Sequence, residues 1–266
     1  MVNFKKIIKN TLIFRATYMI FYGLKFYNKK IYLLFLKSFT SKEITSFNYS
    51  LTDINFQNLI KTIATITSSD YTRCQEYYDE LYNNQNIVNI IKTSRIDNFD
   101  SRIEFSGRIL NYIFIRQLKP KLVIENGVEI GVNSLLMCEA LKKNIEEGYY
   151  GEFIGVDINP NSGVLLKRED YHFAKLIIQD TIKFLSSFDK NIDYYFSDGC
   201  RFPDYERKEF KALEKHIHNS TIIVSNKSTF SNELLQFAIY KSRKFITFKE
   251  DVQNHWYPGA TFGFFY

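Results

Sequence analysis

The chain has 266 residues, of which 45% are hydrophobic and 24% charged, and its net charge is +6. This length is enough for one large domain with a buried core, and the composition is that of a globular protein, which excludes a disordered one. The three cysteines are too few and too far apart for a disulfide framework or a zinc site, which favours a reducing, cytoplasmic location.

The positive charge is concentrated at the N-terminus. Residues 1–50 hold nine Lys and Arg residues and a single acidic residue, so the rest of the chain carries a net charge of −2. A basic surface over the whole protein is therefore excluded, and we expect no nucleic-acid partner.

This basic arm is rich in apolar residues, but its longest uncharged run, residues 16–24, has nine residues. A membrane-spanning helix needs about 20 predominantly apolar residues, so a span is not expected. Two interpretations stay open. The arm forms amphipathic helices that cap the domain or pair with a second copy in a homodimer. Alternatively, residues 1–50 make a peripheral contact with anionic lipid on the inner face of the membrane.

Helix-like spacing continues to residue 118. Ser69 or Asp70 is suited to cap a helix that runs through 77–81, and residues 87–91 and 109–118 are also predicted to be helical. Pro120 disfavours the helical conformation in the residue before it. We therefore predict an N-terminal helical cap over residues 1–118 and a second domain over residues 119–266.

Beyond Pro120, short apolar runs alternate with segments of helix length, which predicts an α/β fold with a parallel sheet covered on both faces. Only residues 250–259 separate the last two strands, too few for a crossover helix, so these strands should form an antiparallel pair at the sheet edge. The predicted strands are 122–125, 153–157, 174–178, 192–197, 221–225, 244–249 and 260–266. The predicted helices between them are 133–143, 162–167, 181–187, 204–216 and 230–240.

A glycine-bracketed turn follows the first of these strands, in the segment Val123-Ile-Glu-Asn-Gly-Val-Glu-Ile-Gly-Val-Asn-Ser134. Gly127 and Gly131 allow the backbone to pass close beneath a ligand at a helix N-terminus. The dinucleotide fingerprint Gly-x-Gly-x-x-Gly lacks its first glycine here, and Glu125 would repel a pyrophosphate and attract an ammonium. The turn therefore favours a nucleoside that carries an amino acid over one that carries phosphates.

Acidic residues stand at or just after the ends of four successive strands: Glu125, Asp157, Asp180 and Asp198. Ligands of open α/β sheets bind outside the carboxyl ends of the strands. A carboxylate at Asp157 can accept both hydroxyls of a ribose, and Asp180 with Thr181 is suited to meet an adenine amino group. Each acid can also serve as a simple helix cap or turn residue.

Four motifs carry a family resemblance: residues 118–134, Gly155-Val-Asp157, Ser197-Asp-Gly199 and Asn254-His-Trp-Tyr-Pro-Gly259. With them, residues 109–266 resemble class I S-adenosylmethionine-dependent methyltransferases, in particular a bacterial group associated with sugar and polysaccharide biosynthesis. The resemblance implies a Rossmann-like, doubly wound, seven-stranded sheet with a reversed last strand, preceded by a helical cap. It also implies S-adenosylmethionine as the cofactor.

The resemblance further implies where the cofactor binds. Glu125, Gly127 and Gly131 would surround the methionine tail, Asp157 the ribose, and Asp180 with Thr181 the adenine. Three neighbouring residues complete the expected set: Asn133, Ser134 and Ile158.

Methyl transfer to a hydroxyl needs a positioned acceptor and a group that removes the proton. Asp198 is the first candidate for that group, and His255 in the C-terminal loop is the second. No metal is expected, because the fifth strand ends in Ser225-Asn226 where related metal-dependent enzymes carry acids, and Mg²⁺ prefers charged oxygen ligands. Arg201 is placed to recognise a phosphate or carboxylate of the acceptor, although a solvated loop arginine is the simpler interpretation.

The expected function is transfer of a methyl group to an oxygen of a small polar acceptor. That acceptor would be a sugar, a nucleotide-linked sugar or a phosphorylated precursor of a bacterial surface glycan. Two alternatives stay open: an NAD-linked oxidoreductase, and a non-catalytic cofactor-binding scaffold that docks on a membrane or a glycan-assembly complex.

Overall fold

The computed structural model describes residues 16–18, 20, 49–93, 105–253, 255 and 257–266. Most of the basic N-terminal arm lies outside these residues, so both interpretations of the arm stay predictions. Within the described part of the chain, no helix has the length and apolar character needed to cross a bilayer.

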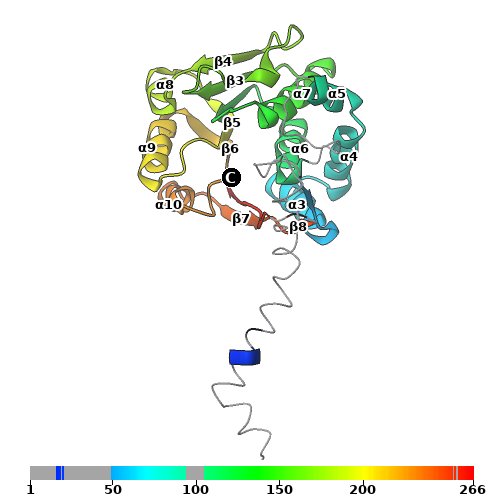
Figure 1. The fold of residues 1–266 in the computed structure, drawn as a ribbon. Helices are drawn as coiled ribbons and strands as arrows, with labels where there is room; N and C mark the ends of the chain where they lie inside the picture. The colour runs from blue at the N-terminus through cyan, green and yellow to red at the C-terminus, as the bar shows by residue number, and fades with distance from the viewer. Residues whose placement is uncertain (1–15, 19, 21–48, 94–104, 254, 256) are drawn as a thin grey trace, which may run out of the picture.

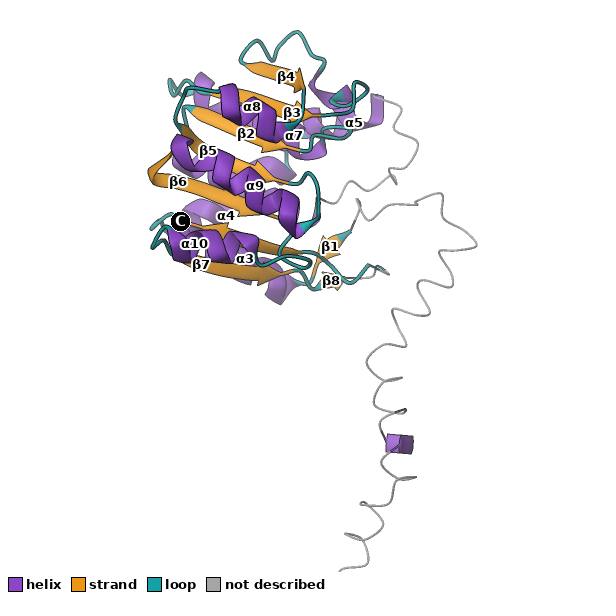
Figure 2. Ribbon diagram, turned by 90° about the vertical axis from the view of Figure 1, so that its left-hand side faces the viewer, coloured by secondary structure: helices purple, strands orange, loops and turns teal. Residues whose placement is uncertain are grey.

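A seven-stranded sheet in the order β4-β3-β2-β5-β6-β9-β7 organises the fold (Figure 2). Strands β2 to β6 pair in parallel, whereas β9 runs antiparallel to both of its neighbours, β6 and β7. The predicted doubly wound α/β sheet with a reversed last strand is confirmed. The antiparallel pair is also present, with β7 at the sheet edge and β9 one position inside it. The strands are β1 Ser50–Leu51, β2 Leu122–Asn126, β3 Glu152–Asp157, β4 Ala174–Ile178, β5 Ile192–Ser197, β6 Ile217–Ser225, β7 Phe245–Lys249, β8 Val252–Gln253 and β9 Thr261–Phe265.

Helices cover both faces of this sheet (Figure 1). Because side chains alternate along a strand, β5 directs Tyr194 and Phe196 to one face and Tyr195 to the other. Helices α3 to α7 close the first core, and α8 to α10 close the second. The α-helices are α3 Asp53–Ile66, α4 Tyr71–Tyr82, α5 Gln85–Thr93, α6 Ile109–Leu118, α7 Val132–Glu146, α8 Thr181–Ser187, α9 Pro203–Leu213 and α10 Glu233–Tyr240. The 3-10 helices are η1 Ser106–Arg108, η2 Val164–Leu166 and η3 Glu214–His216.

The predicted strands all form, and β6 differs most, since it begins four residues earlier than expected, at Ile217. The predicted helix over 162–167 is wrong. Only the short turn η2 forms there, because Gly163 just before it adopts a left-handed φ of 71°. The helix expected from residue 230 begins at Glu233. Of the two predicted caps for α4, Asp70 is the one used, and its carboxylate accepts a hydrogen bond from the amide of Thr72 at 2.7 Å.

Helix α6 connects the N-terminal helices to the sheet. Its Phe114 ring lies 5.8 Å from the ring of Tyr194 on β5, measured between centroids. Two residues further on, the Arg116 guanidinium is almost fully buried, with ion pairs of 2.7 Å to Glu80 on α4 and 2.5 Å to Glu147 after α7. A buried cation is stable only when it is paired, so these contacts fix α6 between α4 and α7.

A buried carboxylate holds together three segments that are far apart in sequence. Glu250, which precedes β8, accepts hydrogen bonds from the Tyr49 hydroxyl at 2.5 Å and from the amides of Gly107 and Ala260 at 2.7 and 2.6 Å. The pairing of β1 with β8 lies beside this cluster. Tyr49 and Ala260 both line the cavity described next, so Glu250 fixes part of its wall.

Candidate functional site

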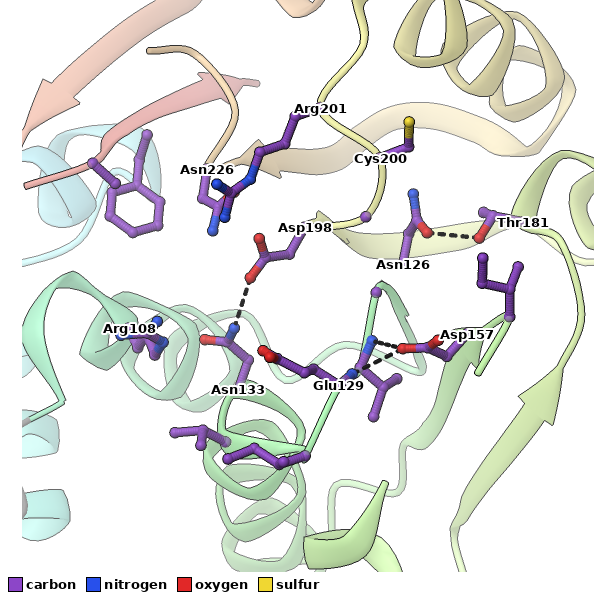
Figure 3. A pocket seen from close by; sticks show the side chains of 18 of the residues that line it. Arg108, Asn126, Glu129, Asn133, Asp157, Thr181, Asp198, Cys200, Arg201 and Asn226 are labelled. Carbon is purple, nitrogen blue, oxygen red and sulfur yellow. Dashed lines mark hydrogen bonds between the residues drawn. The ribbon is translucent and has the colours of Figure 1, made fainter. Parts of the chain in front are cut away.

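A cavity of about 570 Å³ opens at the carboxyl ends of the parallel strands. The strand order reverses at β2, which has β3 on one side and β5 on the other. Open α/β sheets bind their ligands at such a reversal. Figure 3 shows side chains from several strand ends around the cavity, among them the predicted site residues Asp157, Thr181 and Asp198.

The loop from β2 to α7 forms the floor of this cavity. It has a left-handed backbone at every second residue, with φ of 86° at Gly127, 52° at Glu129 and 95° at Gly131. A Cβ atom on Gly127 would lie 2.7 Å from the Cα of Gly199, so only glycine fits at that close approach. Gly131 does not line the cavity; its conformation starts α7.

Asp157, at the end of β3, orders that loop. Its Oδ2 accepts hydrogen bonds from the amides of Val128 at 2.9 Å and Glu129 at 2.8 Å, and its Oδ1 accepts one from Asn159 at 2.8 Å. Ile158 beside it is 73% exposed and also lines the cavity. Asp157 therefore holds the loop in place while its carboxylate still faces the cavity.

The next strand end brings Asp180 and Thr181 to the same cavity. Asp180 caps α8 through the amide of Lys183 at 3.0 Å and accepts a hydrogen bond from the Tyr205 hydroxyl at 2.9 Å. The Thr181 hydroxyl donates to Oδ1 of Asn126 at 2.6 Å. Both residues thus have structural roles, and their contact with an adenine stays a prediction.

Asp198 follows β5 and lies at the centre of the site. Asn133, on the first turn of α7, donates a hydrogen bond to it at 3.2 Å and accepts one from Asn111 on α6 at 3.1 Å. Burial raises the pKa of Asp198 to about 6, and the positive charge of Arg108 opposes that rise. A carboxylate with such a pKa is suited to accept a proton near neutral pH.

Glu125 and Ser134 lie beneath the loop and do not line the cavity. The Ser134 hydroxyl donates a hydrogen bond to the fully buried carboxyl group of Glu125. Burial raises the pKa of Glu125 well above its ordinary range. This pair joins the end of β2 to the first turn of α7 and supports the floor from below, so the structure offers no direct contact between it and a ligand in the cavity.

His255 is also outside the cavity lining. It is 4% exposed, its ring centroid lies 5.3 Å from that of Tyr49, and its Nδ1 accepts a hydrogen bond from the amide of Tyr257 at 2.9 Å. Tyr49 and Tyr257 form the wall in front of it. The structure therefore gives His255 a place behind the wall, where it supports these two tyrosines.

Several residues that line the cavity could not be predicted from the sequence. The most important of them is Arg108, the last residue of η1. Figure 3 shows Arg108 and Arg201 on the same side of the cavity as Asp198. Arg108 lowers the pKa of Asp198 and of Glu129. No sequence signal marks Arg108, because the fold alone brings it to the strand ends.

The cavity has no evident metal site. Among the residues that the structure describes, no group of three or more His, Cys, Asp or Glu side chains is placed to hold a metal ion. Asn226 after β6 lines the cavity near Asp198, as its position in the sequence predicts.

Comparisons with known proteins agree with this architecture. Residues 124–226 match a family model described as a methyltransferase domain. The chain is similar in fold to the O-methyltransferase from Bacillus cereus in complex with SAH, with a TM-score of 0.51 and 10% identity over 71% of this chain and 94% of that one. It is also similar to cofactor-bound Rv0187 from MTB, with a TM-score of 0.52 and 9% identity over 68% of this chain and 87% of that one. No curated protein matches the sequence.

The class of protein that follows is a Rossmann-like α/β protein, and residues 124–226 of its chain match the model of a methyltransferase domain. At such low identities the structural likeness concerns the fold. What the cavity binds and which reaction it performs are argued below from its residues.

Proposed function

We propose that the protein transfers a methyl group from S-adenosylmethionine to an oxygen atom of a small polar acceptor. The observation that carries this proposal is the cavity at the reversal of strand order, with the Gly127 loop on its floor, Asp157 on one side and Asp198 at its centre. The matched methyltransferase domain and the SAH-bound Bacillus cereus relative support the same cofactor.

The residues around the cavity fit this cofactor. Asp157 accepts three backbone hydrogen bonds, and a carboxylate offers about four acceptor positions, so capacity remains for a ribose hydroxyl. Asn126 lines the cavity, and its Nδ2 has no hydrogen-bond partner among the described residues. The volume of about 570 Å³ lies within the range of small-molecule sites.

When bound, S-adenosylmethionine supplies an activated methyl group on a sulfonium. Asp198 accepts the proton that the acceptor hydroxyl loses, since its raised pKa lies close to neutrality. Asn133 holds the Asp198 carboxylate through the hydrogen bond of 3.2 Å, which fixes the direction of that proton transfer. Tyr49 and Tyr257 shape the wall against which the acceptor lies.

The acceptor end of the cavity favours an anionic molecule. Arg108 and Arg201 both line it, and a guanidinium binds phosphate or carboxylate groups in a bidentate manner. Aromatic side chains at Tyr49, Tyr257 and Phe262 offer flat surfaces for the apolar face of a ring. A sugar acid, a sugar phosphate or a nucleotide-linked sugar used for a bacterial surface glycan combines these features.

An NAD-linked reaction is not favoured. A dinucleotide would bring its pyrophosphate to the loop after β2, where the carboxylate of Glu129 faces the cavity. Like charges at that position repel each other, whereas phosphate-binding loops present backbone amides.

The first test is calorimetric titration with S-adenosylhomocysteine, followed by transfer of a labelled methyl group to sugar acids, sugar phosphates, nucleotide sugars and neutral sugars. We expect the protein to bind S-adenosylhomocysteine and to transfer the methyl group to anionic acceptors. The Arg108→Met variant should lose this transfer while its Kd for the cofactor stays unchanged. Arg207→Met is the matched control, because Arg207 is exposed on α9 and does not line the cavity.

The outcomes separate the parts of the proposal. Absence of S-adenosylhomocysteine binding would exclude the cofactor. Binding without transfer to any acceptor would favour the non-catalytic scaffold, and a preference for neutral sugars would exclude the anionic acceptor.

A further inference from the structure

Glu129 adopts a backbone conformation that its residue type disfavours. Its φ of 52° is left-handed, as at Gly127 and Gly131 on either side of it in the same loop. At those two positions the sequence has glycine, which reaches this region without steric cost, whereas a side chain with a Cβ atom is strained there. A strained residue on a ligand-facing loop calls for a functional explanation.

The backbone contacts of Glu129 do not explain the choice of glutamate. Its amide donates to Asp157 at 2.8 Å, and its carbonyl accepts a hydrogen bond from the amide of Gly163 at 2.6 Å. Glycine at position 129 would make both contacts with less strain. The exposed carboxylate is what distinguishes glutamate from glycine at this position.

That carboxylate faces the cavity and has no internal partner. Within the described part of the chain, it accepts no hydrogen bond and forms no ion pair within 4.0 Å. Burial raises the pKa of Glu129, Arg108 lowers it, and the nearby Asp157 raises it again. The carboxylates of Glu129 and Asp157 both face the cavity, and a cationic ligand group would stabilise that arrangement.

The position of Glu129 indicates which ligand group that is. Figure 3 shows the Glu129 side chain between Asp157 and Thr181 on one side and Asn133 and Asp198 on the other. If the nucleoside lies over Asp157 and the methyl acceptor beside Asp198, Glu129 faces the segment between them. In S-adenosylmethionine the sulfonium lies in that segment, and the amino-acid branch that leaves the same sulfur carries the α-ammonium.

We propose that Glu129 recognises the positive charge on the amino-acid end of the cofactor and makes the site selective for it. This inference rests on the proposed cofactor. The recognised cation is the α-ammonium or the sulfonium, and both would form a charge-assisted interaction with the carboxylate.

The experiment measures Kd by calorimetry for three ligands with the wild type and with Glu129→Gln. S-adenosylmethionine carries both cations, S-adenosylhomocysteine keeps only the ammonium, and 5′-methylthioadenosine has neither. We expect Glu129→Gln to raise the Kd for S-adenosylhomocysteine about tenfold and to change the Kd for 5′-methylthioadenosine by no more than about twofold. A larger loss for S-adenosylmethionine than for S-adenosylhomocysteine would assign the sulfonium as the recognised cation and would equally support charge recognition.

Two further variants separate ligand recognition from folding. Glu129→Gly removes both the strain and the carboxylate, so Tm should rise by about 2 °C while S-adenosylhomocysteine affinity falls. Ser242→Gly is the matched control, because Ser242 has the same φ of 52° and does not line the cavity. It should raise Tm without an effect on affinity.

Other results would overturn the inference. Equal affinity of the wild type and Glu129→Gln for all ligands would exclude charge recognition. An equal loss for all three ligands, or a fall in Tm with Glu129→Gly, would show that Glu129 maintains the loop. If the wild type binds none of the three ligands, the proposed function itself fails.

Discussion

The substitution Asp198→Asn should make the protein more stable and less active at the same time. Burial raises the pKa of Asp198 from the ordinary value of 3.8 to about 6. Each pKa unit corresponds to about 1.4 kcal/mol, so ionisation of Asp198 costs the folded state up to about 3 kcal/mol. The carboxylate is partly accessible from the cavity, so this cost is smaller in practice. We expect Asp198→Asn to raise the free energy of unfolding by about 1–2 kcal/mol.

The sign of this effect sets its pH dependence. Between pH 4 and pH 6 the folded state keeps a proton on Asp198 that the unfolded state has lost, so the contribution of this group to stability falls as pH rises. The advantage of Asp198→Asn should therefore be complete above pH 6 and disappear as pH falls towards 4. Urea denaturation at pH 7.5 and pH 4.5 measures it, with the exposed Asp189→Asn as the matched control.

Turnover should change in the opposite direction. Loss of a general base costs about 10²–10⁴ in kcat, and the wild-type rate should decline below about pH 6 as Asp198 becomes protonated. A variant that is no more stable than the wild type at pH 7.5, or whose advantage is unchanged at pH 4.5, would refute the assignment of the raised pKa. Unaltered turnover would remove Asp198 from catalysis.

Three other substitutions test the framework around the cavity. Asp157→Asn should weaken S-adenosylhomocysteine binding at least tenfold in calorimetry, since an amide cannot accept all three backbone hydrogen bonds; unchanged Kd would exclude it from the site. Lys227→Met should cost about 3 kcal/mol in urea denaturation, because it leaves the fully buried Glu209 without its cation at 3.1 Å, and a loss below about 1 kcal/mol would contradict that view. Glu250→Gln should raise the acceptor KM and leave cofactor Kd unchanged, because it loosens Tyr49 at the cavity wall; a shift in cofactor Kd alone would contradict this role.

The sheet was predictable because its strands follow simple rules. Parallel strands buried on both faces appear as continuous apolar runs, and β2 is buried over its whole length. Polar residues then mark where each run ends, as Asp157 does at the end of β3 and Asp198 does after β5. The antiparallel β9 followed from chain length alone, since the segment after β7 cannot form a crossover helix.

The part of the site that the sequence did not reveal depends on long-range packing. Arg108 reaches the cavity because α6, which follows it, packs against α7 and β5. No local sequence pattern predicts this packing. His255 was a reasonable candidate by residue type, but it lies behind Tyr49 and Tyr257. Glu129 appears in the sequence as an ordinary acid between two glycines, and its strain becomes visible only in the backbone angles.

The two ends of the cavity are built by different parts of the chain, which has a consequence for specificity. The end that we propose for the cofactor consists of short loops at the ends of β2, β3 and β4, fixed by Asp157 and by the close contact of Gly127 with Gly199. The end that we propose for the acceptor combines Arg108 and Tyr49 from the N-terminal segments with the C-terminal loop, all gathered around Glu250. Substitutions in the first set would break the hydrogen bonds of Asp157 or the close contact that only glycine allows, whereas connecting segments generally vary more than the sheet. Under the proposed function, the choice of acceptor can therefore change while the cofactor site is kept.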